Sequence, residues 1–366
     1  MLNSFKRLIG LNGLHVIFSI ALVLNAPLTL FSNPGQIKFQ SISIENGLSQ
    51  NFVQCIYKDK KGFMWIGTRD GLNRYDGYRI ITYRHDPSNP KSISNNFIND
   101  IIEDKDGNLI IGTSKGLNKW NRADKSFTRY DRPANPYTIS DLMLDSKRRV
   151  WAATVNAGLL LFNPVTGKFH SYLQKDAKSN NIHKVFEFGD GVLWLASRAG
   201  LDEVNIRAKR VKRFKTDSGN SKMLGASIIR DIYRDSKGVI WLGVYRKGLA
   251  RYNKEDKSFT SYNYTPAKPE GITDAFIWAI SEGPDGKLWL GTETKGICVF
   301  DYKTGKSVSY GPDVSNRFSL NHRWVRTLYK DKSGNVWIGT QAGGVNLRSK
   351  TREKFKHITG TGGQTD

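Results

Sequence analysis

The sequence predicts an all-β protein assembled from repeats, and three observations support this prediction. The 366 residues include 35 Gly, 9 Trp, 15 Tyr and 18 Phe, a composition that favours short strands joined by tight turns over long helices. A phrase that opens with Trp, an apolar residue and Gly recurs along the chain, as in "GFMWIGTRDGLNRYDG" from Gly62 and "GNVWIGTQAGGVNL" from Gly334. Short strand-like runs surround each copy of the phrase, and glycine-containing turns separate them.

Seven copies of this phrase are present, at a spacing of about 45 residues, which is typical of a propeller blade or a solenoid unit. Gly or Ala stands two residues after the first residue of every copy, and a second glycine follows shortly afterwards. We therefore expect one structural unit that is repeated, rather than a catalytic motif that recurs. The anchor residues that open the copies are Trp65, Ile110, Trp151, Trp194, Trp241, Trp289 and Trp337.

Each copy has the pattern of four strands. In the first copy these strands are expected at Phe52–Asp59, Phe63–Thr68, Gly71–Tyr75 and Arg79–Tyr83. The turn "KDKKG" recurs as "EDKDG", "RDSKG" and "KDKSG", where Asp can accept backbone N–H groups and Gly supplies a positive φ. Four short antiparallel strands make one propeller blade. The predicted fold is therefore a seven-bladed β-propeller of four-stranded antiparallel blades over residues 37–358.

The two ends of the repeat region are expected to meet. Ile37–Ser43 stands in the phase of a fourth strand ahead of the first full repeat, so we expect it to complete the last blade and close the ring. Lys354–Ile358 would then be left over, and residues 359–366 would form a tail where an eighth repeat begins. We interpret the chain as the front part of a longer protein or as a truncated gene product.

Residues 1–31 are predicted to be a signal peptide or an N-terminal membrane anchor. Lys6 and Arg7 precede an apolar run that is densest at Leu14–Leu24, a length typical of the apolar core of a signal peptide. Apolar residues continue to Phe31, and Pro27 makes a poor cleavage site, which keeps the anchor as an alternative. Both interpretations place the rest of the chain in the periplasm or otherwise outside the cytoplasm, and a buried core helix is less favoured.

The chain is strongly basic, with a formal net charge of +23. Its densest basic stretch, Asn205–Lys215, falls on the outer strands of the fourth repeat. Lys and Arg on an outer strand prevent edge-to-edge pairing, and a polyanion-binding patch is the alternative. Nucleic acid is not expected as a partner outside the cytoplasm.

The two cysteines, Cys55 and Cys298, are predicted to be free thiols. Their blades, the first and the sixth, are not neighbours in a seven-membered ring, so their Cα atoms cannot come within disulfide distance. No CxxC motif or His/Cys cluster indicates a metal site, and no cofactor is expected.

The repeated phrase resembles the two-component regulator propeller repeat, whose pattern runs like D-x-x-G-x-x-W-I-G-T-x-x-G-L. The opening "ENGLSQNFVQCIYKDKKGFMWIGTRDGLNRYDGY" resembles the start of the periplasmic sensor region of hybrid two-component sensors. The resemblance covers Phe39 to about Ile358. It implies longer relatives that carry a second propeller, a small β-sandwich, a membrane span and a cytoplasmic histidine kinase, and it implies an oligosaccharide ligand from polysaccharide breakdown.

Three classes of function are compatible with these expectations. We favour an extracytoplasmic ligand-binding sensor module of a two-component signalling system, which recognises an oligosaccharide without chemistry. A propeller polysaccharide lyase or glycosidase is the first alternative, and a protein-interaction scaffold is the second. Gly112–Gly116 matches the G-x-S-x-G motif of a nucleophile elbow, but "GTRDG" fills the same place in the first copy, which indicates a loop between strands. No catalytic residue is predicted.

The ligand site is predicted on the face where the second-to-third strand loops and the starts of the first strands converge. Aromatic planes there can stack on sugar rings, and guanidinium and amide groups can bind hydroxyls and carboxylates. Basic groups outnumber acidic ones on this face, which also carries His183 and Glu293, so an acidic oligosaccharide is favoured. Arg69, Arg246, Arg323 and Trp324 are the strongest candidates. The full set is Asn51, Arg69, Asn96, Arg198, Arg230, Tyr245, Arg246, Trp278, His322, Arg323 and Trp324.

Overall fold

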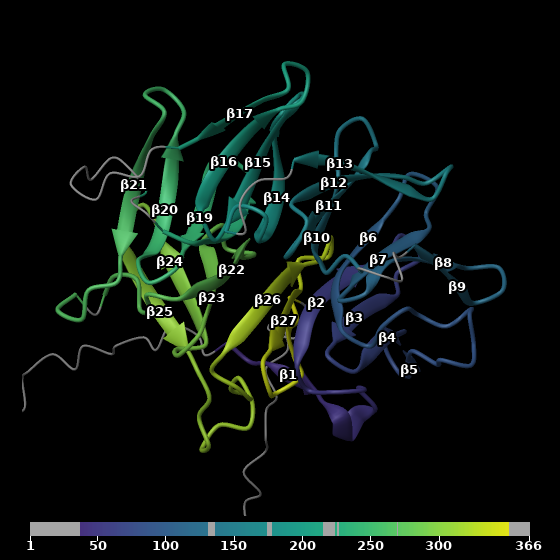
Figure 1. Ribbon diagram of the computed structural model, residues 1–366. Helices are drawn as coiled ribbons and strands as arrows, with labels where there is room; N and C mark the ends of the chain where they lie inside the picture. The colour runs from purple at the N-terminus through teal and green to yellow at the C-terminus, as the bar shows by residue number, and fades with distance from the viewer. Residues whose placement is uncertain are drawn as a thin grey trace, which may run out of the picture. The chain divides into compact units, whose positions relative to one another are not determined.

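The described part of the chain folds into seven four-stranded antiparallel sheets. The structure is a computed structural model that describes residues 37–130, 136–173, 178–214, 224, 227–268 and 270–350. The sheets follow one another around a common axis (Figure 1), which confirms the predicted seven-bladed propeller. The predicted segments 1–31, Lys354–Ile358 and 359–366 lie outside the described residues.

The first two strands of each blade form its inner half. Every first strand contacts the first strands of both neighbouring blades, so these strands surround the axis. The first strands are β2 (Val53–Lys58), β6 (Ile98–Glu103), β10 (Ile139–Leu144), β14 (Ile182–Gly189), β18 (Ile229–Arg234), β22 (Ile277–Glu282) and β26 (Val325–Lys330). The second strands are β3 (Met64–Thr68), β7 (Leu109–Thr113), β11 (Val150–Thr154), β15 (Val192–Ser197), β19 (Ile240–Val244), β23 (Leu288–Thr292) and β27 (Val336–Thr340).

The third and fourth strands form the outer half of each blade. The third strands are β4 (Gly71–Tyr75), β8 (Gly116–Asn121), β12 (Leu159–Asn163), β16 (Gly200–Asn205), β20 (Gly248–Asn253), β24 (Ile297–Asp301) and β28 (Val345–Arg348). The fourth strands are β5 (Ile80–Tyr83), β9 (Ser126–Tyr130), β13 (Lys168–Leu173), β17 (Arg210–Arg213), β21 (Ser258–Asn263), β25 (Lys306–Tyr310) and, for the seventh blade, β1 (Gln40–Ile42). The basic stretch around β17 therefore lies on an outermost strand, as predicted.

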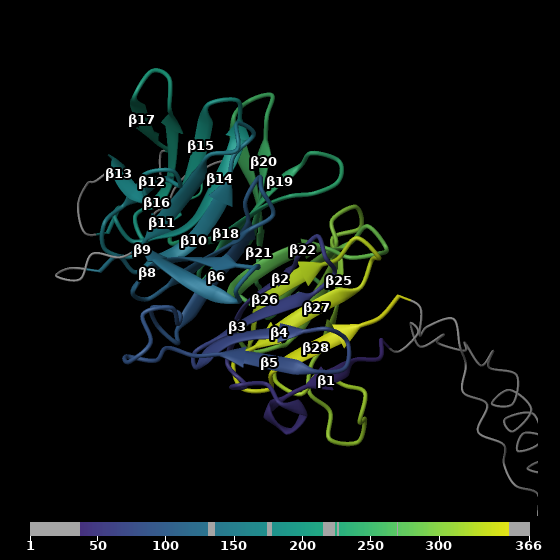
Figure 2. The same cartoon turned by 90° about the vertical axis from the view of Figure 1, so that its right-hand side faces the viewer.

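The N-terminal strand closes the ring. β1 pairs antiparallel with β28, and Gln40, Ser41 and Ile42 lie opposite Leu347, Asn346 and Val345. Figure 1 and Figure 2 both show this purple strand beside the yellow C-terminal sheet. A short 3₁₀ helix, η1 (Ile44–Asn46), then leads the chain into the first blade. The seventh blade is thus assembled from both ends of the propeller, which confirms the predicted closure.

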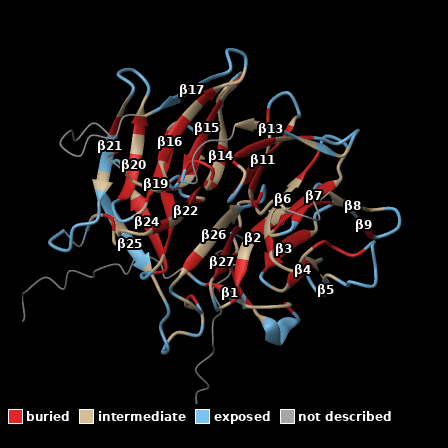
Figure 3. Ribbon diagram, in the orientation of Figure 1, coloured by how far each residue is buried: buried red, intermediate tan, exposed pale blue. Residues whose placement is uncertain are grey.

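The blades pack closely because the second strands carry small residues. A Cβ atom added to Gly112 would lie 2.6 Å from Ile139 Cγ2 in the next blade, so only glycine fits there without movement. The second strands of six blades are buried at every residue, as the red segments in Figure 3 show. Cys55 and Cys298 are both buried and free, as predicted.

In four blades, the turn before the second strand is held by an aspartate that also binds the anchor tryptophan. In the fifth blade, Asp235 Oδ1 accepts the backbone N–H of Val239 at 2.9 Å and Asp235 Oδ2 accepts the Trp241 indole N–H at 3.0 Å. Asp59, Asp145 and Asp331 bind their anchor tryptophans in the same way. The recurring Asp of the turn sequence therefore satisfies a buried donor that the core would otherwise leave unpaired.

Replacing Asp235 by Ala is expected to lower the free energy of unfolding by about 2–4 kcal/mol, because a buried indole N–H and the turn amides lose their acceptor. Denaturant titration would measure this loss. Asp106→Ala is the matched control, because this side chain is 59 % exposed and pairs with neighbouring Lys105, so the change should stay within about 0.5 kcal/mol. Equal effects of the two substitutions would contradict the structural role of Asp235.

Candidate ligand-binding site at the channel mouth

All seven first strands carry a β-bulge at the same place. The register against the second strand shifts between Val53 and Cys55 in the first blade and at the equivalent position of every other blade. A bulge leaves one residue without a cross-strand partner and redirects its side chain. We call these seven residues the bulge ring: Gln54, Asn99, Ser140, His183, Arg230, Trp278 and Arg326.

The bulge ring lines an open cavity of about 350 Å³ on the axis. All seven members contribute to its wall, together with Phe97, Ser114, Thr138 and Val155. Thr138 directly precedes a first strand, and Ser114 and Val155 directly follow second strands. The cavity is therefore at the face predicted from the sequence, and we call it the channel mouth.

Members of the bulge ring bind one another or the backbone of the next blade around the mouth. Arg326 Nη2 donates to Gln54 Oε1 at 3.1 Å, and Gln54 Nε2 donates to Asn99 Oδ1 at 3.5 Å. Asn99 Nδ2 continues to the Ile139 carbonyl oxygen at 2.7 Å, and Ser140 Oγ donates to the Ile182 carbonyl oxygen at 2.6 Å. These contacts span the first four blades and the seventh and hold the ring in one arrangement.

Two arginines share one indole on the opposite side of the mouth. The guanidinium carbons of Arg230 and Arg326 lie 4.5 Å and 4.1 Å from the Trp278 ring centroid, within range of a cation–π interaction. Burial, followed by repulsion from Arg230 and Arg69, lowers the pKa of Arg326 to about 10, so it keeps its charge at neutral pH. Arg230 Nε is buried without a partner among the described residues. Two guanidinium groups therefore converge on this side of the mouth, beside the Glu293 carboxylate that accepts the Trp278 indole N–H at 3.0 Å.

In the bulge ring, His183 lies between Arg230 and the uncharged side chain of Ser140. Its Nε2 lies 3.4 Å from Arg230 Nη1 and is placed to accept a hydrogen bond. Burial, with smaller effects from the charges of Arg230 and Arg198, lowers the pKa of His183 to about 3. The imidazole is therefore neutral at physiological pH.

A second layer of charged residues follows the bulge ring along the same strands. Lys184 Nζ binds Asp141 Oδ1 at 2.9 Å, while Asp141 Oδ2 accepts the Val185 N–H at 2.9 Å. Asp100 accepts the Leu142 N–H at 2.7 Å, and Asp231 accepts the Ile280 N–H at 2.8 Å. We call Asp100, Asp141, Lys184 and Asp231 the charged layer. Three of its four members bind the backbone of the next blade, so the layer joins neighbouring blades.

Burial sets the ionisation of the charged layer. It raises the pKa of Asp100 to about 7, with a further contribution from Asp141 and opposition from Lys184. It raises the pKa of Asp231 to about 6, again opposed by Lys184. The surrounding carboxylates outweigh burial at Lys184 and raise the pKa of its ammonium group. Lys184 therefore acts as the internal counter-ion of this layer.

Six of the predicted site residues lie at or beside the channel mouth. Arg230 and Trp278 line it directly. The ring centroid of Trp324 lies 5.6 Å from that of Trp278, and the ring of Tyr245 lies 5.0 Å from the Arg230 guanidinium. Arg69 lies 3.6 Å from the Phe52 ring, and Arg198 contributes charge near His183. The aromatic planes of the mouth thus hold arginines in place.

The structure does not bring the other five predicted residues to the cavity wall. Asn51 accepts the Ile44 N–H at 3.0 Å. His322 Nδ1 accepts the Trp324 N–H at 3.1 Å, and the Arg323 carbonyl accepts the Gly296 N–H at 2.8 Å. Arg246 has a positive φ of 65° and is exposed.

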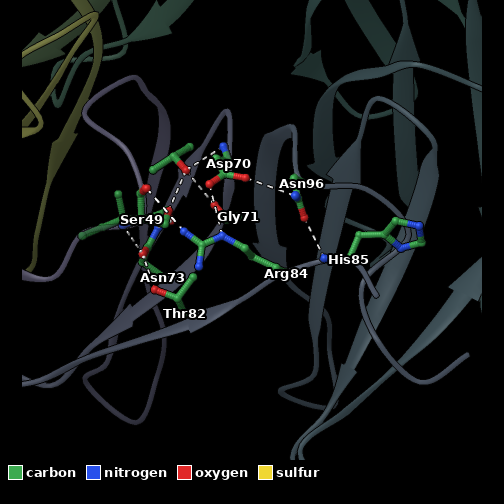
Figure 4. A network of polar contacts seen from close by, with 10 residues as sticks. Ser49, Asp70, Gly71, Asn73, Thr82, Arg84, His85 and Asn96 are labelled. Atoms are coloured by element: carbon green, nitrogen blue, oxygen red, sulfur yellow. Dashed lines mark hydrogen bonds and ion pairs between the residues drawn. The ribbon is translucent and has the colours of Figure 1, made fainter. Parts of the chain in front are cut away.

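Asn96, the fifth of these residues, belongs to a loop network between the first two blades. Its Oδ1 accepts the His85 N–H at 2.6 Å, and its Nδ2 donates to Asp70 at 3.1 Å. Asp70 also pairs with Arg84 at 3.1 Å, and Figure 4 shows the amide between Asp70 and His85. The side chain is therefore occupied by structural contacts.

The sequence analysis missed Gln54, Asn99, Ser140 and Arg326 of the bulge ring. Each follows a β-branched apolar residue that stands at a constant offset before the anchor: Val53, Ile98, Ile139, Ile182, Ile229, Ile277 and Val325. Alignment of the repeats on that residue would have collected the whole ring. Among the residues that the structure describes, no His, Cys, Asp and Glu side chains gather in a group that could hold a metal ion, and no helix is long and apolar enough to cross a membrane.

Comparison with known proteins identifies the repeat. The family model of the two component regulator propeller matches residues 47–70, 92–115, 223–246, 271–294 and 319–342. A curated relative, histidine kinase P4 from Formosa agariphila, is 39 % identical over 77 residues, which are 21 % of this chain and 6 % of the kinase. The matched segments include the bulged strands of the first, second, fifth, sixth and seventh blades.

Solved structures show the same architecture. The extracellular domain of a protein assigned as the hybrid two component system BT3049, from B. thetaiotaomicron, superposes with a TM-score of 0.73 at 30 % identity and covers 86 % of this chain. A second extracellular domain from that organism, of BT4673, has a TM-score of 0.69 at 20 % identity over 85 % of this chain. This chain spans 42 % and 40 % of those two solved chains.

The fold is also shared with an enzyme. Virginiamycin B lyase from Staphylococcus aureus has a TM-score of 0.64 at 13 % identity, over 85 % of this chain and 99 % of the lyase. At this identity the likeness shows the fold alone, whereas the repeat matches and the 30 % identical domain connect the chain to extracellular sensor propellers. Five of the seven repeats of this chain therefore match the two component regulator propeller.

Proposed function

We propose that this propeller is the ligand-binding domain of an extracytoplasmic sensor in a two-component system, and that it binds an acidic oligosaccharide at the channel mouth without chemistry. The observation that carries this proposal is the pair of guanidinium groups on Trp278, which face an open cavity of about 350 Å³. The bulge ring adds amide and hydroxyl groups around the same cavity, and such groups bind sugar hydroxyls. The kinase that would receive the signal is proposed as part of a longer protein, as in the histidine kinase relative.

The arginines supply the affinity for an acidic group. They are held by aromatic rings before the ligand arrives, so little side-chain freedom is lost on binding. Each offers N–H donors in a planar fork that suits a carboxylate or a sulfate. Because both guanidinium groups are partly buried, water competes less for their N–H donors. Their interaction with an anion is therefore stronger than it would be at an exposed surface.

Replacing Arg326 by Ala is expected to weaken binding of an acidic oligosaccharide by about 1.5–3 kcal/mol, the range for hydrogen bonds to charged groups. Calorimetry with oligogalacturonides, sulfated galactose oligosaccharides and neutral galactobiose would measure this loss. Affinity for the acidic sugars should also fall with added salt. Arg210→Ala on the exposed part of β17 is the matched control and should leave binding unchanged. Tighter binding of neutral sugars, or unchanged affinity of a folded Arg326→Ala protein, would contradict the proposal.

His183 favours a second candidate function, a polysaccharide lyase. The His183 imidazole is neutral and its Nε2 lies 3.4 Å from Arg230 Nη1 in the cavity, which makes it a candidate general base, although a weak one because its pKa is about 3. Chromatography of the same oligosaccharides after prolonged incubation separates the candidates. Unchanged sugars support a sensor, and cleavage that His183→Ala abolishes supports a lyase.

A further inference from the structure

The hydrogen bonds of the bulge ring run from the seventh blade towards the fourth on one side of the channel mouth and from the fifth blade to the fourth on the other. Donors lead from Arg326 through Gln54 and Asn99 to the Ile139 carbonyl, and Ser140 donates onward to the next blade. From the other side, Arg230 donates to His183. The hydrogen-bond donors that face the cavity are therefore concentrated at the fifth to seventh blades. The second and third blades contribute fewer of them.

The third blade presents two acceptors to the cavity. Ser140 Oγ and Thr138 Oγ1 both donate their protons to carbonyl oxygens, of Ile182 and Ser114 respectively. Each hydroxyl oxygen thus keeps its lone pairs for another partner. The amide nitrogen of Asn99 is also occupied, at 2.7 Å from the Ile139 carbonyl oxygen.

Charge also distinguishes this side of the mouth. The carboxyl groups of Asp100 and Asp141 follow Asn99 and Ser140 as the next residues of the same two strands. An acidic group placed against Ser140 would meet lone pairs first and, behind them, the carboxyl groups of Asp100 and Asp141, of which Asp141 is paired with Lys184. A neutral hydroxyl group placed there donates a hydrogen bond and meets no like charge.

We propose that Ser140 and Thr138 form a second subsite, which binds the neutral end of the ligand through the ligand's own hydroxyl donors. The ligand then lies across the mouth in one direction, with its acidic unit on Arg230 and Arg326 and a neutral sugar unit at the second and third blades. Val155, which is 39 % exposed, adds an apolar contact beside this unit. This inference rests on the proposed function and narrows the ligand class to an acidic unit joined to a neutral unit.

The test compares three probes that share one acidic unit: galacturonate, digalacturonate and galacturonosyl-rhamnose. Calorimetry on the full chain is expected to show galacturonosyl-rhamnose binding roughly two- to tenfold more tightly than galacturonate, which is the value of one neutral hydrogen bond. Digalacturonate should gain nothing from its second acidic unit. Ser140→Ala should abolish the gain for galacturonosyl-rhamnose.

Two further variants keep the test decisive. Thr138→Val removes the other acceptor without touching the Ile182 carbonyl, so it serves if Ser140→Ala folds poorly. Ser171→Ala on the exposed part of β13 is the matched control for the loss of a hydroxyl group. It should change no affinity.

The outcomes separate this inference from the proposed function. If galacturonate binds and depends on Arg326, but the rhamnose unit adds nothing or digalacturonate binds as tightly as galacturonosyl-rhamnose, the second subsite is wrong and the sensor site stands. If no acidic probe binds, or binding is indifferent to Arg326→Ala, the proposed function is wrong and this inference is overturned with it.

Discussion

A chain that begins at residue 47 is expected to unfold roughly 6–24 °C below a chain that begins at residue 37. The ten residues removed contain β1 and η1, and their loss exposes the β28 edge of the seventh blade. Phe39 and Ile42 are buried, at 4 % and 5 % exposure. Two buried side chains of this size contribute about 3–6 kcal/mol together, and each kcal/mol moves the melting temperature of a large domain by roughly 2–4 °C.

Calorimetry or circular dichroism on the two shortened chains would measure this difference. Both lack residues 1–36, so the comparison isolates β1 and η1. Phe39→Ala in the longer chain tests the same closure without removing backbone, because Phe39 packs with Trp289 and Val325 of the last two blades. This substitution should account for about half of the loss in melting temperature. Equal melting temperatures of the two shortened chains would show that the ring closes without β1.

The repeat made the architecture predictable from the sequence. Seven anchors fixed the number of blades, and the phase of Ile37–Ser43 indicated closure by the N-terminal strand. The turn aspartates were correctly interpreted as structural, because an Asp that recurs before a glycine satisfies turn amides wherever it stands. These features depend on local chemistry that every copy repeats.

The candidate site was less predictable, because a bulge breaks the alternation of a strand. Simple alternation gives no reason to choose Gln54 rather than Cys55 as the residue that reaches the axis, and only the pairing with β3 shows the shift. For loop residues the error was the opposite one, because residues with a structural role were predicted to bind the ligand. Asn51 and Asn96 have the composition of a sugar-binding loop, yet their amides satisfy backbone N–H groups where the chain crosses between blades.

Variation among the repeats carries the chemistry that the shared pattern does not. The bulged position is Gln, Asn or Ser in the first three blades and His, Arg, Trp or Arg in the last four. The fold requires a bulge in the backbone at this position, but it does not require a particular side chain there. The polarity of the channel mouth therefore arises at the position where the fold constrains the residue type least.

The charged layer is expected to make stability depend on pH in a defined direction. Folded Asp100 has a pKa of about 7, and an unfolded aspartate has a pKa of about 4. Between these values the folded chain binds more protons, so stability from this group is complete below about pH 4 and is lost as the pH rises through about 7. Asp231, at about 6, acts in the same direction, and neutral His183, at about 3, acts in the opposite one.

Asp100→Asn should remove the contribution of Asp100 and keep an acceptor for the Leu142 N–H. Relative to wild type, the variant should gain on the order of 2–4 kcal/mol between pH 4 and pH 8, from a shift of about three pKa units at about 1.4 kcal/mol each. Comparing the two proteins at each pH cancels the contribution of His183 and of the unchanged surface. Denaturant titrations at pH 4, 6 and 8 would measure the difference, and Asp106→Asn is the exposed control.

The same titration links the charged layer to ligand binding at the channel mouth. A proton on Asp100 removes negative charge behind the bulge ring, so an acidic oligosaccharide should bind more tightly at pH 6 than at pH 8. Asp100→Asn should bind with the higher affinity at both pH values. If the affinity of the Asp100→Asn variant falls between pH 6 and pH 8 by as much as the affinity of wild type does, the ionisation of Asp100 does not affect binding of the acidic ligand. In that case the arginines and His183 alone would set the electrostatics of the mouth.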